Sequence, residues 1–435
     1  MSQALDDFAP AWRIAEAVAG GEARAEAVVG RALARIRALD VLINAFTDVA
    51  AERALEQARS IDRDRDAGRP LGPLAGVPFA VKNLFDIRGL PTRAGSKINR
   101  DLPPAAADGV LVQRMTAAGA VLLGGLNMGE YAYDFTGENE HDGACRNPHD
   151  PARMAGGSSS GSGAATAAGF VPLALGSDTN GSIRVPASFN GVFGLKPTYG
   201  RLTRRGSFPF CDHLGPFART VRDLAVAYDA MQGPDPDDPA CARRPAEPTL
   251  DRLGEGLDGL RIAVLGGYFA TDGMPEAAAA VAAVAGALGA DRTVTAEGVE
   301  AGRAAAFIIT NAESARLHLD NLRTRPDDFD SDTRDRFLAG ALLPAGWHVR
   351  AQQVRQWYRE RFAELFREAD ALIAPATPFP APEVGQKTVT IRGREVLLRP
   401  NIGLFTQPIS AIGLPVCAVP VVDTRTPSPF LGAAG

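Results

Sequence analysis

Residues 156–197 read GGSSSGSGAATAAGFVPLALGSDTNGSIRVPASFNGVFGLKP, which is two Gly/Ser clusters separated by a run of small apolar residues. A Gly/Ser tract on its own is typical of a flexible linker. The run that follows argues against a linker, because residues 163–175 are small and apolar and contain no proline before Pro172. We therefore expect a helix there that packs closely against its neighbours.

The second cluster, GSDTNGS at 176–182, predicts a turn that binds an anion. Gly176, Asn180 and Gly181 tolerate positive φ, so successive backbone N–H groups can point in one direction. Such donors beside Ser182 would stabilise the oxyanion that forms when a serine attacks a carbonyl group. Ser182 is therefore the candidate nucleophile.

The base for this serine is better sought in a lysine than in a histidine. Residues 77–83, VPFAVKN, predict a buried strand in which Lys82 interrupts an apolar run. A lysine in that setting is either salt-bridged or snorkelling towards solvent, or it is a base whose pKa burial lowers towards neutrality. None of the five histidines lies in the context of a G-x-S-x-G nucleophile elbow; they are His141, His149, His213, His318 and His348.

The two serine clusters and the lysine strand together resemble the signature of the amidase-signature hydrolases, over about residues 10–420. The resemblance implies a Ser–cis-Ser–Lys triad, with Ser182 in NGSIR as the nucleophile, Ser158 in GGSSS as the cis-serine and Lys82 in FAVKN as the base. It also implies amide hydrolysis through an acyl-enzyme. The oxyanion hole would be formed by the backbone N–H groups of Thr179, Asn180, Gly181 and Ser182.

Shorter stretches resemble one subgroup of that family, the carboxybiuret hydrolases that serve cyanuric acid and s-triazine degradation. This resemblance implies carboxybiuret as the substrate, ammonia as a product and a small helical partner subunit. The alternatives are a broad-specificity amidase, a catalytically impaired binding subunit or an amidotransferase A-type subunit. The stretches are GSDTNGSIRVPAS with Asn180 in place of the commoner glycine, FTGEN at 135–139, CRNPHD at 145–150, DHLGPFAR at 212–219 and NAESARLHLDNLRTRPDDFD at 311–330.

Three further residues are candidates for substrate contact. Tyr133 lies in the polar and aromatic stretch MGEYAYDFTGEN, which is typical of a pocket lining but equally of the edge of a core. A carboxylated substrate requires a cation near Ser182, and Arg184 and Arg316 are the candidates. Each arginine is more often a structural salt-bridge residue.

The composition excludes several other classes of protein. With 435 residues, 46% of them hydrophobic and 22% charged, the chain is typical of a globular enzyme with one large core or two modest ones. A net charge of −5 gives no basic footprint for nucleic acid. No apolar run reaches the length of a membrane span, and the N-terminus does not resemble a signal peptide. We therefore expect a cytoplasmic protein that acts on a small amide or urea-like substrate and forms a homo- or hetero-oligomer.

No cofactor or metal is expected. Neither G-x-G-x-x-G nor G-x-x-x-x-G-K-[ST] occurs, so the glycines of RIAVLGGY do not indicate a nucleotide loop. The four cysteines are scattered without a C-x-x-C pair, which indicates free thiols in a reducing compartment. These cysteines are Cys145, Cys211, Cys241 and Cys417.

Strands alternate with helices along the chain, which predicts an α/β fold. The family resemblance sharpens this to one large mixed twisted sheet flanked by helices on both faces. Residues 1–70 are expected as N-terminal helices, at 11–39 and 47–67, packed on an amidase signature domain at 71–435 as one continuous α/β unit. Other predicted strands are 77–83, 121–127, 261–268 and 371–376, and other predicted helices are 108–118, 221–231, 275–289, 312–323, 331–341 and 346–369.

The chain departs from the family pattern in two places. Between SFPF and DHLGP it has only Cys211, where relatives carry a longer loop. After residues 413–421 it continues as DTRTPSPFLGAAG, where relatives have a strand and a closing helix. We therefore expect an altered or truncated C-terminal end, with a sheet edge left unpaired.

Overall fold

The computed structural model describes residues 5–208 and 213–421, and two of the sequence-based expectations lie outside them. These are the shortened loop at Cys211 and the altered C-terminal tail. Within the described ranges, no helix combines the length and the apolar character that crossing a membrane requires.

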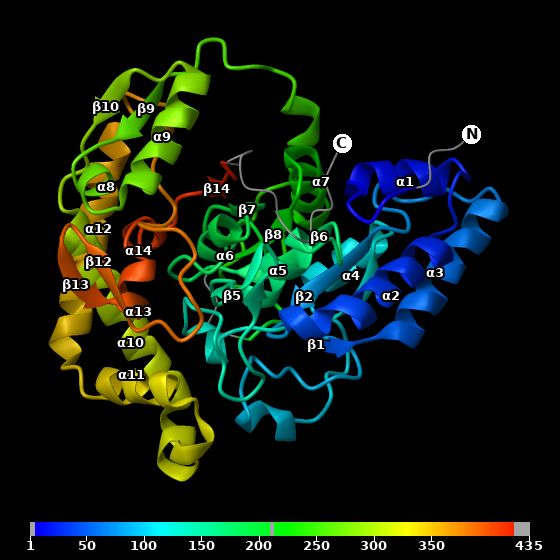
Figure 1. Ribbon diagram of the computed structural model, residues 1–435, viewed down its shortest axis with the longest axis horizontal. Coiled ribbons are helices and arrows are strands. Elements are labelled where there is room, and N and C mark those ends of the chain that lie inside the picture. The colour runs from blue at the N-terminus through cyan, green and yellow to red at the C-terminus, as the bar shows by residue number, and fades with distance from the viewer. Residues whose placement is uncertain (1–4, 209–212, 422–435) are drawn as a thin grey trace.

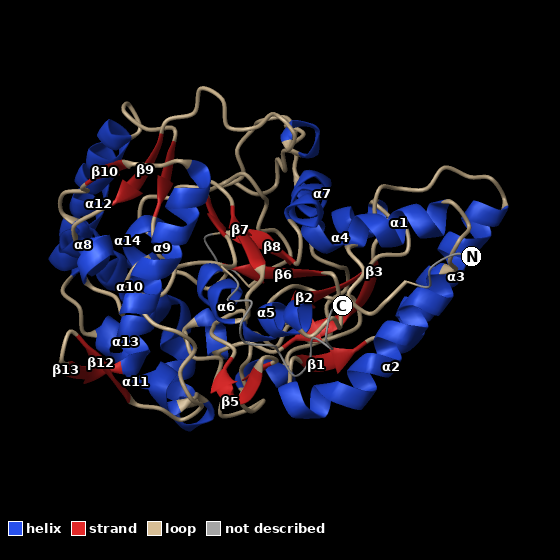
Figure 2. Cartoon of the chain, turned by 45° about the horizontal axis from the view of Figure 1, so that its top comes forward, coloured by secondary structure: helices blue, strands red, loops and turns tan. Residues whose placement is uncertain are grey.

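A mixed sheet of seven strands forms the centre of the molecule, in the order β1-β3-β2-β6-β8-β7-β14. The strand β2 runs parallel to both of its neighbours, whereas the outer pairs are antiparallel. Every residue of β2, β3, β6 and β8 is buried, so both faces of the central sheet are covered (Figure 2). The strands are β1 Phe46–Val49, β2 Pro78–Lys82, β3 Val121–Leu126, β6 Leu173–Ser177, β7 Phe193–Lys196, β8 Leu214–Ala218 and β14 Val416–Ala418.

The helices between residues 11 and 231 pack against this sheet or against one another (Figure 1). Their apolar side chains share one core with the strands; Val29 and Ile61 belong to the same cluster as Phe79 and Leu122. The helices are α1 Ala11–Ala19, α2 Ala25–Ile43, α3 Ala51–Asp66, α4 Val110–Ala117, α5 Ser160–Ala167, α6 Arg184–Phe189 and α7 Val221–Met231. The mixed α/β fold predicted from the sequence is therefore confirmed.

A second group of elements stands at the other side of the molecule, at the left of Figure 1. It contains a small parallel sheet in the order β10-β9-β11 and has its own apolar cluster around Phe269, Tyr358 and Phe405. The strands are β9 Ile262–Leu265, β10 Arg292–Val294 and β11 Ala371–Ile373. The helices are α8 Tyr268–Thr271, α9 Pro275–Leu288, α10 Val299–Thr324, α11 Ser331–Ala341, α12 Ala345–Leu365, α13 Leu398–Ile402 and α14 Thr406–Ser410.

Short elements complete the described chain. Two antiparallel pairs are formed by β4 Arg146–Asn147 with β5 Asp150–Met154, and by β12 Thr388–Ile391 with β13 Arg394–Leu397. The 3-10 turns are Ile98–Asp101, Glu130–Ala132, Leu250–Arg252 and Pro326–Asp328.

The structure corrects four of the predicted elements. The helix expected at 47–67 begins only at Ala51, because residues 46–49 form β1 and pair with β3. The helix expected at 11–39 is two helices, because the chain turns at Gly21 with a φ of 75°. The helix expected at 163–175 ends at Ala167, and residues 173–177 instead pair with β2 and β8. The helix expected at 312–323 begins at Val299 as part of the longer α10.

A buried histidine on α10 gives a prediction about stability in acid. The ring of His318 lies 4.0 Å from Tyr131 and 4.6 Å from Phe337, and its Nε2 atom has no hydrogen-bond partner among the described residues. Burial lowers the pKa of His318 to about 4. The unfolded chain takes up a proton here below about pH 6.5, whereas the folded chain does not until about pH 4. The free energy of unfolding therefore falls as the pH falls through this window.

We expect His318→Phe to remove this part of the acid sensitivity. Acidification from about pH 7.5 to about pH 5 should cost the variant about 2 kcal/mol less free energy of unfolding than the wild type. Urea unfolding of both proteins at the two pH values measures the difference. Equal losses in the two proteins would show that His318 does not stay neutral in the folded state.

Candidate active site

Lys82 and Ser158 meet at the carboxyl edge of the central sheet. Lys82 is the last residue of β2 and Ser177 is the last residue of the parallel neighbour β6, so both side chains stand at one edge. The Lys82 Nζ atom donates a hydrogen bond of 2.6 Å to the Ser158 Oγ atom and one of 2.9 Å to the Ser177 Oγ atom. All three side chains are fully buried.

Ser158 is held in place by close contact between two backbone segments. The peptide bond between Gly157 and Ser158 is cis. The Gly157 N–H group donates to the Phe135 carbonyl oxygen at 2.8 Å, and a Cβ atom on Gly157 would lie 2.8 Å from the Asp134 carbonyl oxygen. Only glycine allows this approach, which explains the GGSSS motif at this point.

A backbone hydrogen bond from the residue after Ser158 holds Ser182 close to Ser158. The Ser159 N–H group donates to the Ser182 carbonyl oxygen at 3.3 Å, and Ser182 is only 3% exposed. Within the described residues, no hydrogen bond joins the hydroxyl groups of Ser158 and Ser182. A serine hydroxyl turns about a single bond, and catalytic hydrogen bonds often tighten only when substrate is bound.

The loop from Asp178 to Ser182 presents backbone donors that the fold does not use. The N–H groups of residues 179–182 donate to no other described residue. Of the three residues that tolerate positive φ, Gly181 adopts it, with a φ of 141°, whereas Gly176 and Asn180 do not. Gly176 is instead part of the strand β6. Unused N–H groups next to a buried serine are what an oxyanion hole requires.

A buried ion pair between Asp178 and Arg184 stabilises this loop. The Arg184 guanidinium group donates to both carboxylate oxygens of Asp178 at 2.9 Å and to the Thr406 carbonyl oxygen at 3.1 Å. Burial opposes ionisation of Asp178, but the charge of Arg184 outweighs it and lowers the pKa of the carboxyl group. The prediction that Arg184 binds substrate is therefore corrected, because its guanidinium group is engaged within the protein.

Breaking this ion pair should destabilise the whole fold. We expect Asp178→Ala to lower the free energy of unfolding by about 3–5 kcal/mol, because it leaves the buried charge of Arg184 without its partner. Urea unfolding measures the loss. Glu255→Ala is the matched control, since its pair with Arg252 lies on the surface, where solvent screens it and it contributes little to stability. Similar losses in the two variants would contradict the supporting role of Asp178.

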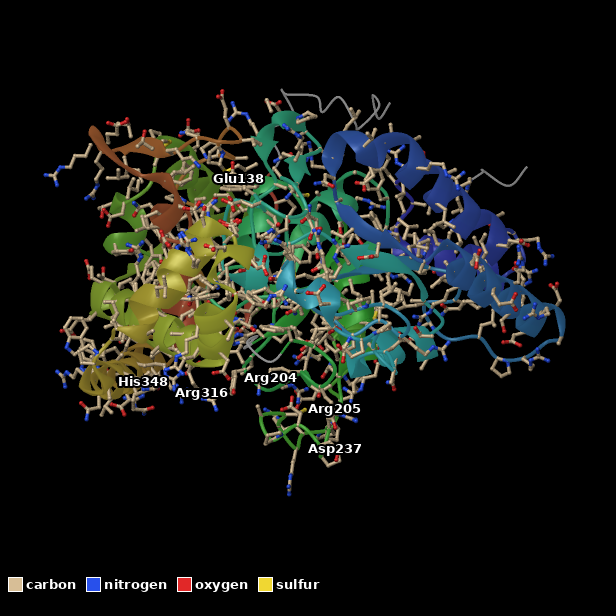
Figure 3. All side chains as sticks on the ribbon, turned by 90° about the horizontal axis from the view of Figure 1, so that it is seen from below. Glu138, Arg204, Arg205, Asp237, Arg316 and His348 are labelled. Carbon is tan, nitrogen blue, oxygen red and sulfur yellow. The ribbon has the colours of Figure 1, made fainter. Side chains whose placement is uncertain are left out.

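The other two residues predicted to contact substrate are Tyr133 and Arg316, and the structure buries the first and exposes the second. Tyr133 is buried, with its hydroxyl group on the Asn311 amide of α10, its ring 4.9 Å from Phe337 and its carbonyl oxygen accepting from Arg336. Burial raises the pKa of Tyr133, so its hydroxyl group stays a neutral donor. Arg316 is exposed on α10 and lies at the outer surface in Figure 3. It forms no hydrogen bond or ion pair with a described residue.

Ser177, Thr310 and Thr406 contact the candidate residues directly, although none of them was predicted from the sequence. Ser177 shares the amine of Lys82, as described above. The Thr310 hydroxyl group accepts a hydrogen bond from the Asn180 side chain, and the Thr406 hydroxyl group donates to the Asn180 carbonyl oxygen. The only signal for Ser177 was its place at the end of an apolar run, and the two threonines gave none.

The described residues contain no cluster that could hold a metal ion, and their cysteines are free. In residues 5–208 and 213–421, no three His, Cys, Asp or Glu side chains are grouped to hold a metal ion. The three described cysteines, Cys145, Cys241 and Cys417, are free thiols. Burial raises the pKa of the Cys145 thiol well above its ordinary value, which keeps it protonated.

Known proteins resemble this chain over most of its length. The family model described as Amidase matches residues 27–430. The AtzE subunit of the 1-carboxybiuret hydrolase of Pseudomonas sp. (strain ADP) is 58% identical over 410 residues, covering 94% of this chain and 90% of that protein. The A subunit of the glutamyl-tRNA(Gln) amidotransferase of Koribacter versatilis (strain Ellin345) is 35% identical over 440 residues, covering 94% of this chain and 90% of the relative.

Solved structures agree with these relatives. One, described as a vestigial protein complex that reveals the origins of an s-triazine catabolic enzyme, has a TM-score of 0.93 and 57% identity. It covers 94% of this chain and 90% of the other. A bacterial aryl acylamidase of the amidase signature enzymes has a TM-score of 0.88 and 26% identity, covering 96% and 90% of the two chains. Sequence, fold and matched length together show that this chain belongs to the amidase signature family.

Proposed function

We propose that this protein hydrolyses an amide C–N bond of 1-carboxybiuret and releases ammonia, with Ser182 as nucleophile, Ser158 as proton relay and Lys82 as base. The observation that carries the proposal is the fully buried contact of 2.6 Å between the Lys82 amine and the Ser158 hydroxyl group. It lies next to a loop whose N–H groups are unused by the fold. The choice of substrate is supported by the relative at 58% identity, whose name states that reaction.

The first half of the reaction forms an acyl-enzyme. Neutral Lys82 accepts the proton of Ser158, and Ser158 accepts the proton of Ser182 as the Ser182 Oγ atom bonds to the substrate carbonyl carbon. The carbonyl oxygen becomes an oxyanion, which the N–H groups of residues 179–182 stabilise; the loss of one such donor typically costs about 10²–10³ in rate. The proton then returns through Ser158 to the leaving nitrogen, the C–N bond breaks and ammonia leaves.

The second half uses the same groups in reverse. A water molecule gives a proton to the relay of Ser158 and Lys82 and attacks the acyl carbon. The bond from this carbon to the Ser182 Oγ atom breaks, and the proton from Lys82 restores the serine hydroxyl group. The acid product loses its proton to solvent and leaves as a carboxylate, and the three side chains return to their starting protonation states.

Ammonia release from a substrate panel tests this proposal. The panel contains carboxybiuret, biuret, simple aliphatic amides and glutamine, and kcat/KM for carboxybiuret should exceed the others by about 10² or more. A preference for glutamine would indicate an amidotransferase A-type subunit, whereas equal rates would indicate a broad-specificity amidase. No turnover together with no labelling by a serine-directed fluorophosphonate would indicate a catalytically impaired binding subunit. Each of these three results contradicts the proposal.

The proposal includes a partner and a compartment. Val41 and Leu42 at the end of α2 are 83% and 50% exposed, and Val49 of β1 is 48% exposed. A small helical subunit, or a second copy of the chain, would cover these apolar side chains. The free thiols fit a reducing cytoplasm. Light scattering of the purified protein should give a mass above the 45.7 kDa of one chain, and a monomeric mass at micromolar concentration contradicts the oligomer.

A further inference from the structure

Two hydrogen bonds of Asn180, one from its side chain and one to its carbonyl oxygen, fix the loop that carries the unused N–H groups. Its side-chain Nδ2 atom donates to the Thr310 hydroxyl group at 3.0 Å, and its carbonyl oxygen accepts from the Thr406 hydroxyl group at 2.8 Å. Thr310 lies on α10 and Thr406 begins α14, so both contacts come from outside the central sheet. Thr310 and Thr406 are 8% and 1% exposed, which shields both hydrogen bonds from water.

These two hydroxyl groups belong to one packed unit. The helices α10 and α14 pack against each other, and the Arg303 Nε atom of α10 donates to the Gln407 Oε1 atom of α14 at 2.8 Å. The next residue of the loop, Gly181, lies so close to α14 that a Cβ atom there would be 2.2 Å from the Thr406 Oγ1 atom. The loop therefore has little freedom to move towards or away from α14.

A threonine inside a helix usually turns its hydroxyl group back to a carbonyl oxygen one turn earlier. Ser314, one turn after Thr310, follows this pattern, because its hydroxyl group donates to the Thr310 carbonyl oxygen at 2.6 Å. The Thr310 hydroxyl group instead accepts from a side chain 130 positions away in the sequence. The contact is therefore a link between the helix and the loop and not part of the helix itself.

We propose that Thr310 and Thr406 are positioning residues of the oxyanion hole, which act through Asn180 to hold the N–H groups of residues 179–182 in place. Preorganised donors stabilise a transition state only if they do not have to move when charge develops. The inference rests on the proposed function in one respect, namely that these N–H groups bind the oxyanion. It does not depend on the identity of the substrate.

Variants of Thr310 and Asn180 test the proposal. Thr310→Val removes the hydroxyl group and keeps the volume, and should lower kcat about tenfold with KM within about twofold of the wild type. Thr310→Ser keeps the hydroxyl group and should restore kcat to within about threefold. Asn180→Ala should match Thr310→Val, and the double variant should be no slower than either single variant, because all three lose one contact. Thr324→Val, which removes a hydroxyl group from the exposed end of the same helix, is the control.

The rate of fluorophosphonate labelling supplies a readout that needs no amide substrate. The phosphonyl oxygen occupies the oxyanion hole as the serine is modified, so Thr310→Val should lower the labelling rate about as much as kcat. If the wild type is labelled but does not turn over carboxybiuret, the proposed substrate fails and the labelling rates still decide the inference. Labelling of Thr310→Val within twofold of the wild type overturns it. So do failure of Thr310→Ser to restore the rate, multiplicative effects of the two single variants, and absence of labelling in the wild type.

Discussion

Replacing Ser182 with alanine should lower kcat for ammonia release by more than about 10⁴, since removal of a serine nucleophile from a comparable relay leaves only binding and the oxyanion hole. The free energy of unfolding should stay within about 1 kcal/mol of the wild type, because the Ser182 hydroxyl group bonds to no other described residue. Coupled ammonia assays and urea unfolding measure the two quantities. KM should change little if the substrate is held by groups other than Ser182.

Ser188→Ala is the matched control for this variant. Ser188 lies in α6, shortly after Ser182 in the sequence. It is exposed, and its hydroxyl group forms a hydrogen bond of 2.9 Å with that of Thr377. Its replacement should leave kcat within about twofold of the wild type. Turnover by Ser182→Ala within tenfold of the wild type would remove Ser182 from the mechanism.

Replacing Lys82 with methionine should lower kcat by about 10³–10⁴, the contribution expected of a general base. Methionine is unbranched and adapts to irregular buried spaces, so the variant should remain folded. Lys82 and Ser158 belong to one relay, and the members of a relay act as a unit. Ser158→Ala and the double variant should therefore be about as slow as Lys82→Met. Steady-state assays of the three variants measure this non-additivity.

Lys97→Met is the control for Lys82→Met. Lys97 is exposed and pairs with Asp328 at 2.5 Å on the surface, so its replacement should not change kcat. If Lys82→Met and Ser158→Ala reduced the rate by independent factors that multiply in the double variant, the two side chains would not share one proton path.

Much of the candidate site could be predicted from the sequence, because Lys82, Ser158 and Ser182 each carry a reactive group within a recognisable motif. The place of Lys82 at the sheet edge, beside Ser177, follows from two parallel strands that end together. Thr310 and Thr406 could not be found in this way. They carry no motif, and they reach Asn180 only through the packing of α10 and α14 against the loop.

The secondary structure likewise divides into elements that the local sequence pattern predicts and elements that depend on tertiary packing. The strand at 77–83 and the helix at 221–231 were predicted closely, because an apolar run and an amphipathic period each indicate one structure. The run of small residues at 163–175 is compatible with helix and strand alike. Its second part became β6 because pairing with β2 and β8 outweighs local preference. Arg184 was misassigned for a similar reason, since its partner Asp178 becomes a buried ion-pair partner only in the folded loop.

The most direct test of the proposed relay is to find which residue reacts with a serine-directed fluorophosphonate. Peptide mass spectrometry of the labelled wild-type protein should place the adduct on Ser182, and Lys82→Met should be labelled far more slowly at the same residue. An adduct on Ser158 or on any other residue, or labelling of Ser182 that does not depend on Lys82, would contradict the relay from Lys82 through Ser158 to Ser182.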